Sequence, residues 1–180
     1  MKDIAMHILD ILQNSVTAGA ENISVTIDED IKGNKLTVIV EDDGKGMDSE
    51  QVERVTDPFF TSRTTRKVGL GIPLFKQSAI QSGGTFFIDS FPGRGTAITA
   101  QFVYDNIDRL PLGDIANVFV LTLSSNPSIE FRLKYIYNGS VYMFDTVEVK
   151  EVLEGVPLSE PGVIKALTDM INENIKDLKC

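Results

Sequence analysis

Two polar side chains near the start of the chain have a spacing that could support chemistry. Asp10 and Asn14 are four residues apart in the segment DILQNS, so in a helix both would lie on one face. A carboxylate and an amide placed in this way can share a metal-bound phosphate and an attacking water molecule. The same spacing is also typical of two solvated polar residues, so the pair alone does not establish a site.

Three glycine-containing segments supply further candidates. In DDGKGM, residues 42–47, Asp42 can accept a hydrogen bond from an exocyclic amine, and Gly44 and Gly46 would let the backbone approach a planar ring. The segment VGLGI, residues 68–72, opens an expected helix whose first amides and dipole would attract phosphate. GRGT, residues 93–96, joins two expected strands. Each segment alone is weak evidence.

The apolar pattern places these segments on regular elements. Helical spacing and boundary residues predict helices over residues 3–17, 49–55 with Ser49 as the cap, 71–82 and 161–178. Alternation predicts strands over residues 23–27, 36–40, 85–91 and 96–104. The order α-β-β-α-α-β-β predicts an α/β fold, a two-layer α/β sandwich.

The region after residue 104 has a different composition. Residues 105–113 read as a linker, and residues 114–180 as an accessory α+β extension of unknown role that begins with an apolar element of uncertain type. Alternating apolar residues on both sides of Asn138-Gly139 predict a hairpin there. Its apolar face is expected to pack on the last helix as a small unit, with a partner-binding or dimer-forming edge as the alternative.

Composition excludes several classes of partner. The net charge is −9 over 180 residues, which disfavours binding to nucleic acid or to anionic lipid. Bound phosphate would therefore need local backbone donors, a helix N-terminus or a metal ion. A single cysteine, Cys180, excludes an intramolecular disulfide. We expect no membrane span and no secretory signal, and hence a cytoplasmic protein.

Five motifs in this order and spacing resemble those of the ATPase superfamily of gyrase, heat-shock chaperones, histidine kinases and mismatch-repair proteins. They are DILQNS, DDGKGM, DPFFTSR at residues 57–63, VGLGI and GRGT. The chain is most similar to a histidine-kinase-like ATPase domain over residues 1 to about 104. The resemblance implies the Bergerat-type ATP-binding fold, with ATP and Mg²⁺ as cofactors.

The resemblance also implies roles for individual residues. Asn14 matches the Mg²⁺ ligand, Asp42 the aspartate that binds the adenine amino group, and Thr96 a threonine near adenine. Asp10 occupies the position of the catalytic carboxylate. The remaining implied ATP-binding residues are Gly44, Gly46, Met47, Ser62, Arg63, Lys67, Gly69, Leu70 and Gly71.

Two departures bear on the mechanism. The ATP-hydrolysing and serine-kinase branches carry glutamate where this chain has Asp10, and typical histidine kinases carry asparagine. Because aspartate is one methylene shorter, we expect slow hydrolysis. Thr17 replaces a basic residue that histidine kinases often have, and Arg63, Arg66 and Lys67 could supply that charge. Residues 57–69 are expected to form a mobile lid that closes on the γ-phosphate.

A phosphoacceptor histidine is the missing part of a full histidine kinase. Because the resemblance starts at residue 2, we expect the module to lack the helical hairpin that carries this histidine, and His7 is the only histidine in the sequence. We expect His7 to be a partly buried polar residue. Three functions remain open: a stand-alone module completed by a separate protein partner, an anti-sigma or serine-kinase type of protein whose partner affinity is gated by nucleotide, and a slow ATPase with a ligand-binding C-terminal part. A homodimer stays open as an alternative.

Overall fold

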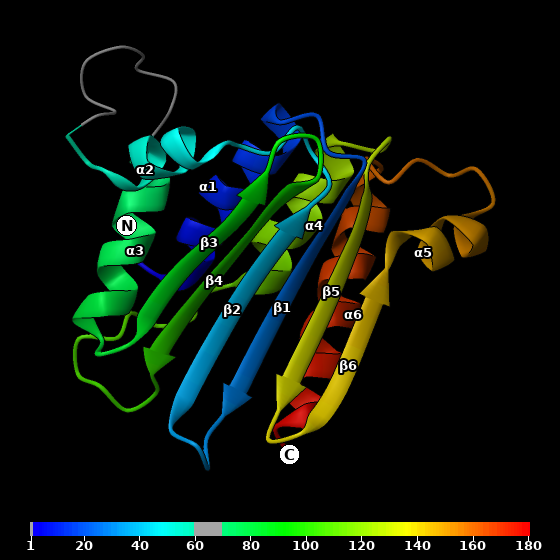
Figure 1. Cartoon of the computed structure of the whole chain (residues 1–180). Helices are drawn as coiled ribbons and strands as arrows, with labels where there is room; N and C mark the ends of the chain where they lie inside the picture. The colour runs from blue at the N-terminus through cyan, green and yellow to red at the C-terminus, as the bar shows by residue number, and fades with distance from the viewer. Residues whose placement is uncertain (1, 60–69) are drawn as a thin grey trace.

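A computed structural model describes residues 2–59 and 70–180. Six strands form one sheet in the order β3-β4-β2-β1-β5-β6. Helices α1, α3, α4 and α6 cover one face of this sheet, and the other face is open (Figure 1). The predicted two-layer α/β sandwich is therefore confirmed. The elements are α1 Ile4–Thr17, β1 Asn22–Asp30, β2 Lys35–Asp42, α2 Ser49–Thr56, α3 Gly71–Gln81, β3 Thr85–Phe91, β4 Gly95–Val103, α4 Ile115–Ser125, β5 Glu130–Tyr137, β6 Ser140–Asp145, α5 Thr146–Leu153 and α6 Pro161–Leu178.

Helix α1 carries the first motif, and its ends are set by local chemistry. Asp3 caps the helix, with its Oδ1 accepting from the Met6 amide at 2.9 Å. Gly19 follows the helix with a φ of +75°, a conformation that glycine adopts without strain. One face of the helix is buried against the sheet, which leaves Asn14 exposed and Asp10 half-buried on the adjoining face.

The first four strands form two hairpins that meet between β2 and β4. β1 pairs with β2 and β3 with β4, all antiparallel, as the alternation predicts. The hairpins join through an antiparallel β2–β4 pair, whose register places Asp42 opposite Thr96. Two motifs that are more than fifty residues apart in the sequence thus become neighbours at one end of the sheet.

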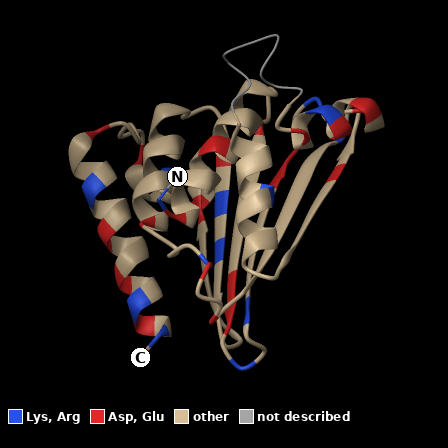
Figure 2. Ribbon diagram, turned by 90° about the vertical axis from the view of Figure 1, so that its left-hand side faces the viewer, with Lys and Arg blue, Asp and Glu red and all other residues tan. Residues whose placement is uncertain are grey.

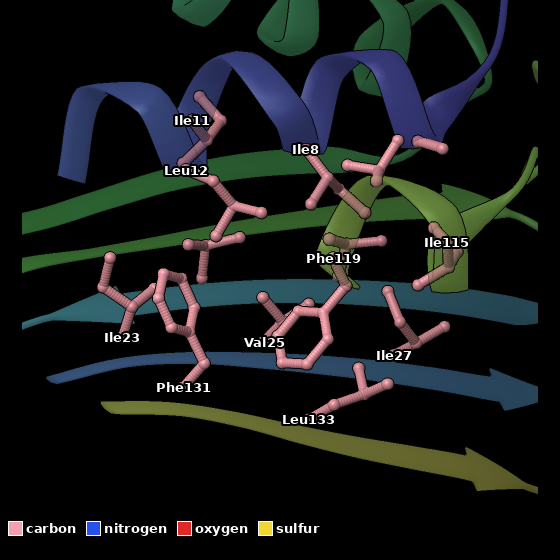
Figure 3. Close-up of a cluster of buried hydrophobic side chains, with 14 of the residues drawn as sticks. Ile8, Ile11, Leu12, Ile23, Val25, Ile27, Ile115, Phe119, Phe131 and Leu133 are labelled. Carbon is pink, nitrogen blue, oxygen red and sulfur yellow. The ribbon is translucent and has the colours of Figure 1, made fainter. Parts of the chain in front are cut away.

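The C-terminal region extends the same sheet and the same core. β5 runs parallel to β1, with Ile23 aligned with Phe131. The Phe119 ring of α4 meets the Phe131 ring edge-on, at a centroid distance of 6.0 Å. Figure 3 shows both rings among side chains from α1 and β1, including Ile8 and Val25. Sheet and core therefore continue across the expected boundary at residue 104.

The structure corrects one local expectation and assigns two elements that the sequence did not define. Asp48, rather than Ser49, caps α2: its carboxylate accepts from the Gln51 amide and the Gln51 side chain accepts from the Asp48 amide. This reciprocal pair satisfies two helix-end donors, which Ser49 as cap would not do. The uncertain apolar element is helix α4, capped by Asp114. Helix α5 was not expected; Asp145 both ends β6 and caps this helix.

The predicted C-terminal hairpin and last helix are confirmed, but they do not form a separate unit. The hairpin turns at Asn138 and Gly139, which both have positive φ. Leu167 and Ile171 of α6 belong to the same buried cluster as the residues under α1. Figure 2 shows that the last helix, α6, carries both acidic and basic positions along its length. Nowhere in the described ranges is a helix long and apolar enough to cross a bilayer.

Candidate functional site

A cavity of roughly 210 Å³ lies at the end of the sheet where β2 and β4 meet α1. Five residues predicted from the sequence line it: Asn14, Asp42, Gly46, Met47 and Thr96. Thr17, which the sequence identified as replacing a basic residue of histidine kinases, also lines it. The sequence did not assign the remaining lining residues to the site; they are Ile11, Ser15, Ala18, Val40, Lys45, Val55, Ile72 and Ile98. Most of these are apolar or small, so their types give no sign of a site until the fold brings them together.

Asp42 is held in a fixed orientation at this cavity. The Ser15 hydroxyl donates to Asp42 Oδ2 at 2.6 Å, and the Gly44 amide donates to Asp42 Oδ1 at 2.9 Å. The side chain is half-buried. Each carboxylate oxygen retains capacity for a further donor, so the group can accept from a ligand amine without losing its supports. Ser15 directly follows Asn14, and only the structure shows that it faces Asp42.

Glycines at two positions allow backbone segments to meet beneath the cavity. Gly46 has a φ of +69°, and a Cβ there would lie 1.9 Å from the Phe91 carbonyl oxygen. Gly95 has a φ of +98°, and a Cβ there would lie 1.9 Å from the Asp42 carbonyl oxygen. Neither position can accept a side chain. The close approach that they permit is therefore to neighbouring backbone, which fixes the 42–47 loop against the β3–β4 turn.

Thr96 belongs to a small hydroxyl network. Ser90 Oγ accepts from the Met47 amide at 2.8 Å and donates to the Gly95 carbonyl at 3.1 Å. The Ser90 and Thr96 hydroxyl oxygens are 2.8 Å apart, and either hydroxyl can be the donor. Thr96 itself lines the cavity, and its hydroxyl can donate or accept. Ser90 was not predicted from the sequence, although it anchors both Met47 and Thr96.

One turn before Asn14, α1 carries Asp10 against the start of α3. A Cβ on Gly71 would lie 2.9 Å from Asp10 Cβ and 3.1 Å from its Oδ2. Helix α3 begins after Leu70, and among the described residues no side chain caps it, so its first amides are suited to an external acceptor. Burial raises the pKa of Asp10 above its ordinary value, which makes the carboxylate a stronger proton acceptor than an exposed one.

Asn14 is exposed at the rim of the cavity, one helical turn from Asp10. Across residues 2–59 and 70–180, no group of three or more His, Cys, Asp or Glu side chains could hold a metal by itself. Mg²⁺ commonly takes one or two protein oxygens and fills its remaining positions with phosphate and water. Asn14 fits the part of such a single protein ligand.

Several predicted residues cannot be placed. Ser62, Arg63, Arg66, Lys67 and Gly69 lie outside the described residues, as does most of the expected lid.

His7 is buried between α1 and α3. It is 3% exposed, and its ring stacks on Phe75 with a centroid distance of 5.2 Å. Burial lowers its pKa to about 4. Its Nδ1 has no hydrogen-bond partner among the described residues. This neutral, inaccessible ring is poorly suited to accept phosphate and fits the expectation of a buried polar residue.

Residues 2–106 match the family of histidine kinase-, DNA gyrase B- and HSP90-like ATPases. The chain belongs to this family. The match covers more than half of the chain and coincides with the region in which the five motifs resemble the superfamily. The family resemblance inferred from the sequence is therefore confirmed.

Individual relatives fall into two groups. The sensor histidine kinase ZraS of Klebsiella oxytoca is 31% identical over 93 residues, covering 51% of this chain and 20% of the relative. The anti-sigma F factor of Thermoanaerobacter sp. (strain X514) is 32% identical over 103 residues, covering 53% of this chain and 65% of the relative. The chain thus spans about a fifth of the sensor kinases' length, but a much larger share of the anti-sigma factor.

Solved structures share the fold beyond the family match. The structure titled "Aquifex aeolicus MutL ATPase domain complexed with ADP" has a TM-score of 0.53 at 16% identity, covering 86% of this chain and 70% of that chain. The N-terminal domain of a DNA repair protein has a TM-score of 0.52 at 13% identity, covering 79% of this chain and 52% of that chain. Both likenesses extend past residue 106, in agreement with the continuous sheet.

Proposed function

We propose that the cavity binds Mg-ATP, and that the chain is a histidine-kinase-like module that hydrolyses ATP slowly or transfers phosphate to a separate protein. The observation that carries this proposal is the arrangement of Asp42. Its carboxylate is fixed by Ser15 and Gly44 and lies opposite Thr96 at the cavity. This geometry suits recognition of an amine on a planar base, as expected for adenine.

The rest of the cavity fits the other parts of the nucleotide. Ile72 and Ile98 are buried apolar residues in its lining, and they would cover the faces of a base. The uncapped start of α3 would receive phosphate, which a chain of net charge −9 can hold only through local donors. Asn14 would hold Mg²⁺, which would neutralise phosphate charge when bound.

Asp10 is the proposed proton acceptor. Its half-buried carboxylate lies beside the first residue of α3, where the terminal phosphate would approach. From there it would accept a proton from an attacking water molecule or a partner's hydroxyl group. Because its side chain is short and limits its reach, we propose that ATP hydrolysis without a partner is slow.

A second candidate function is an anti-sigma or serine-kinase type of binding protein. The observation that favours it is the anti-sigma F factor relative, of which the match covers 65%. In this case the nucleotide state would change the affinity for a partner. Phosphate transferred to serine is stable in acid, whereas phosphate transferred to histidine is not, so acid treatment of the labelled partner separates the two functions.

The binding proposal is tested at the metal ligand. Equilibrium binding of a fluorescent ATP analogue is measured with Mg²⁺ and with a chelator, for the native chain and Asn14→Ala. We expect Mg²⁺ to tighten binding only in the native chain, because Asn14→Ala removes the protein oxygen. Gln13→Ala, an exposed neighbour on the same helix, is the matched control and should keep the Mg²⁺ effect. An equal Mg²⁺ effect in folded Asn14→Ala would refute the assigned ligand.

A further inference from the structure

The strand β6 forms one edge of the sheet. Within the described part of the chain, β6 pairs only with β5, through an antiparallel ladder that aligns Leu133 with Phe144. In such a ladder alternate residues of the outer strand direct their backbone N–H and C=O groups away from the sheet. These groups are a template for pairing with another extended chain.

Apolar side chains flank this edge on both sides. On the open face of the sheet, Val141 is 49% exposed and Met143 is 63% exposed. On the helical side, a cavity of roughly 330 Å³ lies between β6, α5 and α6. Its apolar lining includes Tyr142, Val149 and Met170. An added strand would therefore find apolar contacts for both of its faces.

The surroundings of this edge are strongly acidic. Residues 140–160 contain five Asp or Glu and a single Lys, a net charge of −4 out of −9 for the whole chain. That lysine, Lys150, is engaged by Glu130 at 2.7 Å and by the Pro127 carbonyl at 2.8 Å. Asp145 is bridged to Arg132, but Glu148 lines the cavity and is exposed. A basic occupant is therefore favoured.

We propose that the β6 edge and its cavity bind an extended segment of a partner protein in which apolar residues alternate with Lys or Arg. The segment would add a strand to β6, insert apolar side chains into the cavity, and place its basic side chains near Glu148. Backbone pairing would supply affinity, and the alternate side chains would supply specificity.

The same charges argue against a second copy of this chain as the occupant. Pairing β6 with β6 would bring two segments of net charge −4 together. Like charges placed in this way cost free energy and reduce the rate of association. The acidic rim thus protects an exposed edge from self-pairing while it selects an oppositely charged partner.

The test uses fluorescence anisotropy of labelled synthetic peptides with the full chain, without nucleotide. The probe alternates valine with lysine; one control replaces valine with serine, and another replaces lysine with glutamate. We expect only the valine–lysine peptide to bind in the micromolar to submillimolar range. Equal binding of the serine–lysine peptide would show that charge attraction alone accounts for binding and would overturn the proposal. Failure of the valine–lysine peptide to bind at millimolar concentration would also overturn it.

Two variants locate the binding site. Glu148→Lys should weaken the valine–lysine peptide at least tenfold, whereas Asp108→Lys, the same reversal at an exposed position between β4 and α4, should have a much smaller effect. Hydrogen exchange should slow at the outward-facing amides of β6 when the peptide is bound. Equal weakening by both variants, or unchanged exchange in β6, would overturn the proposal.

Self-association is measured separately by sedimentation. The proposal expects the chain to show no dimer that depends on β6. A dimer that Met143→Lys dissociates would instead identify a second copy as the occupant and would overturn the proposal. None of these outcomes depends on ATP binding, so failure here and failure of the nucleotide proposal are distinguishable.

Discussion

Two regions of the sheet share one core but differ in how their surfaces are built: the end of the inner strands β2 and β4, and the edge strand β6. At the β2–β4 end, glycines bring backbone segments together, and hydroxyl groups orient Asp42 and Thr96. At the β6 edge, an apolar cavity lies beside the strand, and the surrounding residues 140–160 are acidic. The first arrangement suits a small ligand with defined donors, and the second suits a polypeptide. If both proposals hold, one fold carries two kinds of recognition surface around a shared core.

The largest expected effect concerns that shared core. Phe131→Ala removes a fully buried ring that contacts Phe119, and should destabilise the protein by about 3–5 kcal/mol. Because the core is continuous, the whole chain should unfold at a lower temperature in one transition. Calorimetry, together with circular dichroism, measures both properties.

Phe87→Ala is the matched control for this prediction. Phe87 is 64% exposed on the open face of the sheet, so its loss should change stability much less than the loss of Phe131. If Phe131→Ala instead left an early transition for residues after 104 and an unchanged transition for the rest, the two regions would be separate domains and the comparison would fail.

The next effect concerns the packing of α1 against α3. His7 has a folded pKa of about 4, below the model-compound value of 6.5. As pH falls, the unfolded chain therefore binds a proton at His7 before the folded chain does. The stability that comes from a neutral His7 is fully present above pH 6.5 and is lost as pH falls toward 4. The loss should approach about 1.4 kcal/mol for each unit of lowering.

Urea unfolding between pH 7 and pH 5 checks the histidine prediction. His7→Phe, which preserves a ring against Phe75, should show a flatter pH dependence in this window than the native chain. An identical pH dependence in the two proteins would assign the titration to other groups.

The smallest stability effect is expected at Asp10. Burial raises the pKa of Asp10 in the folded state. Protonation of Asp10 therefore favours folding, and the protein loses this stability as pH rises through the raised pKa. Asp10→Asn should therefore be slightly more stable than the native chain at pH 7, and the difference should vanish below the ordinary aspartate pKa.

The same variant tests the proposed role of Asp10 as proton acceptor. In that role, its loss should lower the rate of ATP hydrolysis by about 10²–10⁴-fold. Unchanged hydrolysis would leave Asp10 without that role.

Local patterns predicted most of the elements, because hairpins and helix ends are encoded by nearby residues. The alternation around Asn138-Gly139 identified β5 and β6, and the residues flanking 71–82 identified α3. The parallel pairing of β5 with β1 joins segments more than a hundred residues apart and has no local signal. This is why the C-terminal hairpin was expected to form a small unit rather than an extension of the sheet.

The candidate site was predicted in part for the same reason. Asp42, Gly46 and Thr96 stand in motifs that can be recognised in the sequence, and the structure brings them to one cavity. Ser15 and Ser90 act only through the pairing of distant elements, since their partners come from β2, the 42–47 loop and β4. A serine's type does not reveal such partners in advance.

We propose that Asp42 recognises the adenine base, and the substitution Asp42→Asn tests this role. Affinities for Mg-ATP and Mg-GTP are measured by calorimetry in the native chain, in Asp42→Asn and in Asp43→Asn. Asp43 is the control because its carboxylate binds the amides of Glu21 and Asn22 outside the cavity. We expect Asp42→Asn to weaken ATP binding by about 1.5–3 kcal/mol and GTP binding by less. The preference for ATP should be retained in Asp43→Asn. An equal loss for both nucleotides, or an unchanged ATP affinity in folded Asp42→Asn, would contradict the proposed role of Asp42.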